Sequence, residues 1–110
     1  MESEMTDKIV VFSTCGDAAE ADRLARHLVE ERLAACVSIL PALHSVYRWK
    51  EAIEEATEVL LLIKTSRERF EAVRQGIEKL HSYEVPEIVA VPIVAGSPNY
   101  LNWLEREMHG

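Results

Sequence analysis

Hydrophobic and polar residues alternate along this chain with two different periods. Residues 8–14 form a short β-branched and aromatic run that is typical of a buried strand. Asp17 and Glu20 then have the spacing of a helix N-cap and its reciprocal partner. The apolar residues that follow recur at the helical spacing: Ala21, Leu24, Ala25, Leu28 and Val29. We therefore expect a strand and then an amphipathic helix that ends near Leu33.

A period of two returns in residues 36–49 and 52–64 and predicts two long strands. In the first of them, alternate positions place Leu43, Ser45, Tyr47 and Trp49 on one side. Pro41 interrupts this strand, and because proline cannot donate a ladder hydrogen bond, we expect a bulge or a sheet edge there. The second strand should be half exposed at first and buried from Val59 onward, where it becomes apolar on both sides.

Only Lys50 and Glu51 separate these two strands, so the sequence predicts a tight hairpin that extends as an arm beyond the main sheet. A two-stranded ribbon is marginally stable in water by itself, and its unpaired edges invite association. We therefore expect the arm to pair with other subunits in an oligomer. An exposed ribbon with frayed ends is the alternative.

The last part of the chain predicts a helix, a strand and a second helix. Thr65 or Ser66 is expected to cap a helix that ends near His81. A strand follows at residues 88–94, and its internal Pro92 again favours an edge or a bulge. The terminal helix should begin after Gly96, Ser97 and Pro98, which supply a turn, an N-cap and a first-turn proline.

The resulting order is strand, helix, strand, strand, helix, strand and helix. It predicts an α+β, ferredoxin-like β-α-β-β-α-β sandwich with an extra C-terminal helix. We expect one domain over residues 1–110, in which residues 1–7 form a disordered tail. A hydrophobic content of 48% is sufficient for a core in a chain of 110 residues.

The formal net charge of −7 argues against two classes of anionic partner, nucleic acids and anionic lipid membranes. A negative surface repels phosphate backbones and anionic lipids, so we expect neither nucleic acid nor membrane as a partner. No stretch approaches the roughly 20 apolar residues of a membrane span, and the N-terminus is polar and acidic rather than signal-like. Cys15 and Cys36 are too few for a disulfide framework, so we expect free thiols and a cytoplasmic protein.

Three candidate metal ligands surround Pro86, namely His81, Glu84 and Glu87. Imidazole and carboxylate groups suit divalent ions such as copper and zinc. The alternative is a structural role, in which these side chains cap the helix end or pair with Lys64 and with arginines.

Cys15 lies where the first strand meets the first helix, a place where a helix N-terminus can lower the pKa of a thiol. It is a candidate soft-metal or redox site, or else a buried packing residue, whereas Cys36 is expected to pack. Tyr47, Trp49 and Tyr83 are expected to pack between subunits or to line a ligand cleft. The sequence contains no catalytic or phosphate-binding motif. We therefore expect no enzymatic activity and no required cofactor, with a nucleophilic Cys15 as the alternative.

Five blocks of sequence, in order and spanning about residues 8 to 108, resemble the signature of the CutA divalent-cation tolerance proteins. The blocks are residues 32–37 (RLAACV), 45–49 (SVYRW), 63–65 (IKT), 81–88 (HSYEVPEI) and 100–103 (YLNW). The resemblance implies a homotrimer similar to the trimeric PII signalling proteins. It also implies a role in divalent-metal tolerance, above all towards copper, and no catalytic activity.

The resemblance further implies clefts between subunits, which we expect to be lined by Cys36, Tyr47, Trp49, Lys64 and Tyr83. His81, Glu84, Glu87 and Cys15 would bind Cu(II) or another divalent cation there, with Glu87 as the most transferable ligand. The alternative is a PII-like signalling trimer that binds a small metabolite in the same clefts.

The chain departs from the family pattern at three places. Ser82 stands where the family usually has a proline, and the hairpin turn carries Glu51 and Ala52 where a glycine is usual. Ser13 occupies the position of the cysteine that is proposed as a copper ligand in some relatives, which weakens the case for a cysteine-based copper site.

Overall fold

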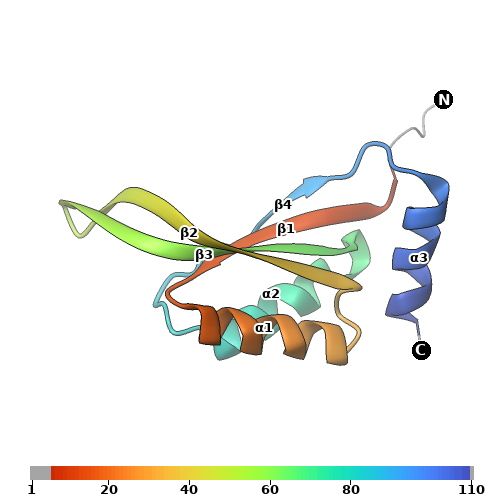
Figure 1. The fold of residues 1–110 in the computed structure, drawn as a ribbon, viewed down its shortest axis with the longest axis horizontal. Coiled ribbons are helices and arrows are strands. Elements are labelled where there is room, and N and C mark those ends of the chain that lie inside the picture. Colours follow the sequence, from red (N-terminus) through yellow and green to blue (C-terminus); the bar gives the residue numbers. More distant parts are fainter. Residues whose placement is uncertain (1–5, 110) are drawn as a thin grey trace.

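The computed structural model describes residues 6–109 and contains one antiparallel sheet, two helices on one of its faces and a third helix at its end (Figure 1). The elements are β1 (Lys8–Cys15), α1 (Ala18–Glu30), β2 (Cys36–Trp49), β3 (Ala52–Ser66), α2 (Phe70–Leu80), β4 (Val89–Pro92) and α3 (Pro98–Met108). This order confirms the predicted α+β class. No helix within residues 6–109 is long and apolar enough to cross a membrane.

The strand order β2-β3-β1-β4 puts both proline-containing strands at the edges of the sheet. The pairing of β2 with β3 shifts between Leu40 and Leu43, and Ala42 in this bulge has a φ of 65°. The prediction for Pro41 is thus confirmed as both an edge and a bulge. β4 is shorter than the predicted strand at residues 88–94, because only residues 89–92 pair with β1.

Beyond the last β1 pair, Cys15 with Val59, β2 and β3 continue as a hairpin arm (Figure 1). Trp49 pairs with Ala52, so the turn consists of two residues. Lys50 and Glu51 have φ values of 49° and 69°, and two left-handed residues are what a type I′ turn requires. The tight hairpin is confirmed, and its pairing with other subunits stays a prediction.

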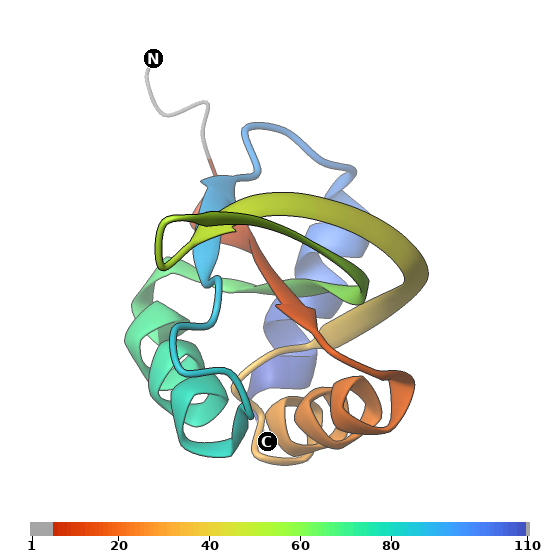
Figure 2. The ribbon, with the colours of Figure 1, turned by 90° about the vertical axis from the view of Figure 1, so that its left-hand side faces the viewer.

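The core lies between the sheet and the two helices α1 and α2, which lie side by side on the same face (Figures 1 and 2). Val11 and Ile63 point from the sheet to this side and pack with Leu24, Leu28 and Ile77. Since successive strand residues point to opposite faces, the other face carries the alternate positions. It is defined by Val10, Phe12, Leu60, Leu62, Val89 and Val91 and is called the uncovered sheet face below.

Helix boundaries differ from the prediction at two places. α1 ends at Glu30, three residues before Leu33, and Arg32 follows in a left-handed conformation with a φ of 58°. Thr65 does not cap a helix: it pairs with β1, and its buried hydroxyl donates a hydrogen bond to the Leu33 carbonyl at 2.6 Å. Arg67–Arg69 form a 3-10 turn, and α2 begins only at Phe70.

The N-terminal end of the described chain is attached to the sheet. Thr6 donates hydrogen bonds to the Ile93 carbonyl through its N–H at 3.3 Å and its hydroxyl at 2.7 Å. The Asp7 carbonyl accepts the N–H of Arg67 at 2.8 Å. Of the predicted tail, these two residues are therefore part of the fold, and residues 1–5 lie outside the described chain. At the other end, the Ser97 hydroxyl caps α3 as predicted.

Candidate functional site

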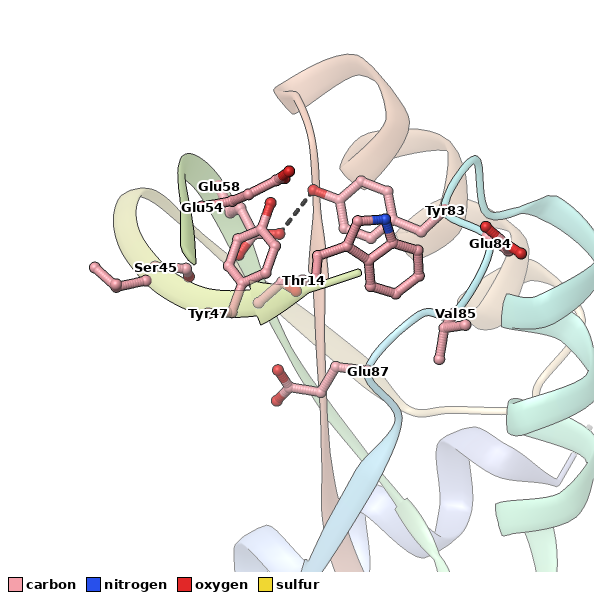
Figure 3. Close-up of a pocket in the computed structure, with 11 residues that line it drawn as sticks. Thr14, Ser45, Tyr47, Glu54, Glu58, Tyr83, Glu84, Val85 and Glu87 are labelled. Carbon is pink, nitrogen blue, oxygen red and sulfur yellow. Dashed lines mark hydrogen bonds between the residues drawn. The ribbon is translucent and has the colours of Figure 1, made fainter. Parts of the chain in front are cut away.

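A pocket of about 570 Å³ lies between the hairpin arm, the end of β1 and the loop that follows α2 (Figure 3). It is lined by Thr14, Ser45, Val46, Tyr47, Trp49, Glu54, Glu58, Tyr83, Glu84, Val85 and Glu87. Among the described residues, its walls include four glutamates and three aromatic rings but no lysine, arginine or histidine. It is called the acidic pocket below.

The arm contributes one face of a two-stranded ribbon to the acidic pocket. Tyr47 pairs with Glu54 across the ribbon, and Leu43 pairs with Glu58. Because alternate residues share a face, Ser45, Tyr47 and Trp49 lie on one side of the arm, and all three line the pocket together with Val46. Glu54 and Glu58 had no predicted role. The hairpin register, counted from the Lys50–Glu51 turn, is the signal that could have placed them on the same face of the arm as the aromatic residues.

Glu58 and Tyr83 form the hydrogen bond at one end of the acidic pocket. The Tyr83 hydroxyl donates to Oε2 of Glu58 at 2.7 Å (Figure 3). Burial and the neighbouring Glu58 carboxylate raise the pKa of the Tyr83 phenol, which keeps it protonated as a donor. Glu58 is only 7% exposed, and within residues 6–109 it forms no ion pair with a basic side chain.

His81 is buried beside the acidic pocket rather than in its lining. Its side chain is 0% exposed. The Nε2 atom lies 2.7 Å from the Thr14 carbonyl, and Nδ1 accepts the N–H of Tyr83 at 3.0 Å. A carbonyl can only accept, so Nε2 carries a proton and donates it. Nδ1 also lies 3.5 Å from Oε2 of Glu20. Both nitrogens are therefore engaged in holding the loop, with partners other than the helix end, Lys64 or the arginines of the structural alternative.

Glu20 attaches the same loop to α1. Asp17 caps α1 by accepting the N–H of Glu20 at 2.8 Å, as predicted. The Glu20 side chain does not reciprocate, however, because its carboxylate accepts hydrogen bonds from Ser82 instead. The prediction is thus confirmed for the Asp17 cap but wrong for the reciprocal contact of Glu20. Glu20 instead has a long-range role that local spacing does not reveal.

The structure divides the predicted metal ligands into two groups. Glu84 and Glu87 line the acidic pocket, whereas His81 and Cys15 do not. Cys15 is 0% exposed. Burial, together with the nearby carboxylates, raises the pKa of its thiol to about 12, so the helix N-terminus does not lower it. Within residues 6–109, no three His, Cys, Asp or Glu side chains come together closely enough to hold a metal ion.

The residues predicted to line a cleft lie in two different places. Tyr47, Trp49 and Tyr83 line the acidic pocket. Cys36 and Lys64 are instead cross-strand partners, and both lie on the side of the uncovered sheet face because Lys64 also pairs with Val10. The Lys64 ammonium donates to the Ser38 hydroxyl at 3.0 Å. In the single subunit, these two residues therefore belong to the sheet surface and not to the pocket.

Comparison with known proteins gives one consistent result. A model of the family described as CutA1 divalent ion tolerance protein matches residues 9–107. The divalent-cation tolerance protein CutA of Thermus thermophilus is 48% identical over 97 residues, which cover 88% of this chain and 94% of that protein. Protein CutA of Mus musculus is 43% identical over 95 residues, and the match covers 86% of this chain but 54% of the mouse protein. The crystal structure of CutA from Xylella fastidiosa matches with a TM-score of 0.91 at 44% identity, covering 94% of this chain and 99% of that one.

Proposed function

The chain belongs to the CutA1 divalent ion tolerance protein family, and from this premise we propose that it is a homotrimer that binds divalent cations, Cu(II) among them, at the acidic pocket. The observation that carries the proposal is the composition of the pocket wall, where Glu54, Glu58, Glu84 and Glu87 meet no basic side chain within the described residues. Such a wall attracts cations and repels anions.

The uncovered sheet face supports the oligomer. Val89 and Val91 are 51% and 43% exposed, and they pair with Phe12 and Val10 of β1. Phe12 in turn pairs with Leu62 of β3. A contiguous apolar patch on a sheet is typical of a protein–protein interface. The projecting arm supports it as well, because pairing with a neighbouring subunit would satisfy its open edges.

Glu87 and Glu84 are the proposed metal ligands on this chain. Because no three candidate ligands of residues 6–109 converge, water or a neighbouring subunit would complete the coordination of the ion. His81 is no longer part of this ligand set, since both of its nitrogens are engaged. We propose binding rather than catalysis as the activity, which the burial and raised pKa of the Cys15 thiol support.

Isothermal titration calorimetry with Cu(II) tests the metal site. We expect Glu87→Gln to weaken the affinity by about tenfold or more, because one carboxylate ligand is lost without a change in shape. Glu30→Gln removes the same charge from the exposed side of α1 and should leave the affinity unchanged. Equal affinities for Glu87→Gln and the parent protein would exclude the acidic pocket as the metal site.

A PII-like sensor that binds a small metabolite is the second candidate function. The volume of about 570 Å³ favours it, because it is large for a bare ion and lies in the range of roughly 300–1,000 Å³ found for small-molecule sites. A metabolite screen in which ligands raise the melting temperature while divalent metals do not would support this candidate. The free thiols Cys15 and Cys36 fit a reducing compartment for either function, and we propose the cytoplasm.

A further inference from the structure

We propose that the acidic pocket binds a small aliphatic amine in its protonated form, with the ammonium group at Glu58 and the carbon chain against the aromatic rings. The proposal deepens the second candidate function, on which it rests, by naming the chemical class of the metabolite. It is carried by three features of the pocket: a buried carboxylate without a cation, an aromatic wall, and a volume that exceeds the needs of an ion.

Glu58 supplies the first feature. Its side chain is more than nine-tenths buried, and the Tyr83 hydroxyl is its hydrogen-bond donor within the described residues. A buried carboxylate that has one neutral donor and no cation is poorly compensated for the loss of water. An ammonium group of a ligand would supply both the missing charge and further N–H donors.

The aromatic wall supplies the second feature. Tyr47, Trp49 and Tyr83 line the pocket together with the carboxylates. Aromatic faces attract ammonium groups that lie within about 6 Å of the ring centroid. The chain already contains one such contact, because the Lys50 ammonium lies 5.7 Å from the centroid of the Trp49 ring. The Trp49 ring thus accommodates an ammonium group.

The shape of the pocket favours an organic cation over a bare ion. Figure 3 shows Glu58 and Glu54 on the side of the Tyr83 hydroxyl, whereas Glu84 lies on the other side of the Tyr83 ring. The carboxylates are therefore distributed around the pocket, in agreement with the absence of a three-ligand cluster in residues 6–109. A flexible cation with an apolar body, such as a diamine, can reach separated carboxylates while its methylene groups cover the rings.

The probe for this proposal is 1,4-diaminobutane, and 1,4-butanediol is its uncharged analogue. Both are titrated calorimetrically into the intact protein near neutral pH, where aliphatic amines are protonated. We expect the diamine to bind and the diol not to bind. Glu58→Gln should weaken diamine binding by about tenfold or more, since it removes the charge but keeps the shape. Glu30→Gln, on the exposed side of α1, is the matched control and should bind like the parent.

Trp49→Leu provides a second variant, on the arm. It keeps the buried Glu58 carboxylate, so its effect on diamine binding does not depend on how the loss of that charge affects folding. It should weaken diamine binding while it leaves the circular dichroism spectrum in the far ultraviolet unchanged. Equal binding of the diol and the diamine, parent-like diamine affinity in both variants, or no diamine binding at millimolar concentration would overturn the proposal. In each of these cases, Cu(II) binding that depends on Glu87 would still support the metal function, and a melting-temperature rise with another metabolite would still support the second candidate function. Failure of the amine site is therefore distinguishable from failure of either function.

Discussion

Glu20 and Ser82 join α1 to the loop after α2 through two hydrogen bonds. The Ser82 N–H donates to Oε2 of Glu20 at 2.7 Å, and the Ser82 hydroxyl donates to Oε1 at 3.0 Å. Glu20 is only 4% exposed, so these donors replace much of the water that its carboxylate loses. A proline in place of Ser82 would have no N–H to donate. In this chain, the two hydrogen bonds from Ser82 to Glu20 therefore hold the loop against α1, whereas a proline would restrict the loop through its own ring.

Substitution of Ser82 should destabilise the protein in proportion to the donors that are lost. We expect Ser82→Ala to lower the free energy of unfolding by about 1–2 kcal/mol, because one hydrogen bond to a charged group is lost. Ser82→Pro should cost more, because it also removes the N–H and leaves the buried Glu20 carboxylate with neither donor. Urea unfolding at a fixed protein concentration measures both changes.

Ser45→Ala is the matched control for the Ser82 variants. The Ser45 hydroxyl makes no hydrogen bond within the described residues, so its loss should change the stability by less than about 0.5 kcal/mol. A Ser82→Pro protein as stable as the parent would show that Glu20 does not hold the loop.

The elements of the fold were predictable because each has a clear period of hydrophobic residues. The misplaced start of α2 shows where such patterns fail. Thr65 and Ser66 are good helix caps by local preference, yet they pair with Ile9 and Lys8 across the sheet, and β3 therefore continues through them. Local propensity is a weak determinant when a neighbouring strand offers a complete ladder of hydrogen bonds.

The residues of the site were predictable only where their position depends on the alternation of side chains along a strand. The period of two placed Tyr47 and Trp49 on the face of the arm that lines the acidic pocket. The position of His81 could not be found in this way, because its ring is fixed by the carbonyl of Thr14, a residue 67 positions away in the sequence. Whether an imidazole is a free ligand or an internal donor depends on such long-range partners.

Cys15 should be unreactive in the folded protein. Burial, and then the carboxylates of Glu20, Asp17 and Glu58, raise the pKa of its thiol from 9.0 to about 12. The thiolate is the nucleophile, so alkylation requires both exposure and ionisation. In a Cys36→Ser variant, where Cys15 is the remaining thiol, iodoacetamide should react at least about a hundredfold more slowly in the native state than in urea. Similar rates in the two states would contradict the buried position of this thiol.

The same shift predicts that Cys15 makes stability fall at alkaline pH. The folded-state pKa is raised, so above pH 9.0 the unfolded thiol loses its proton while the folded one keeps it until about pH 12. The unfolded state then binds fewer protons, and the free energy of unfolding decreases as the pH rises through this range. Urea unfolding between about pH 8 and pH 10.5 should show a steeper decrease for the parent than for Cys15→Ala. Parallel slopes would show that the thiol titrates alike in both states.

The hairpin turn should be improved by glycine. Glu51 has a φ of 69°, a left-handed conformation that costs a residue with a side chain roughly 1 kcal/mol relative to glycine. We expect Glu51→Gly to raise the free energy of unfolding by up to about 1 kcal/mol. Ala52→Gly is the control, since Ala52 begins β3, where glycine weakens a strand. Thermal unfolding should therefore shift in opposite directions for the two variants, and a loss of stability in Glu51→Gly would contradict the turn geometry.

The uncovered sheet face should be the surface through which subunits associate. Val91 on this face and Val29 on α1 have nearly equal exposure in the single subunit, 43% and 41%. If the sheet face is buried between subunits, Val91→Glu places a charge in an apolar interface, where it is costly without a partner. Sedimentation equilibrium should then give a trimer for the parent and for Val29→Glu but a monomer for Val91→Glu. A parent protein that sediments as a monomer, or a trimer that survives Val91→Glu but not Val29→Glu, would show that association does not use this face.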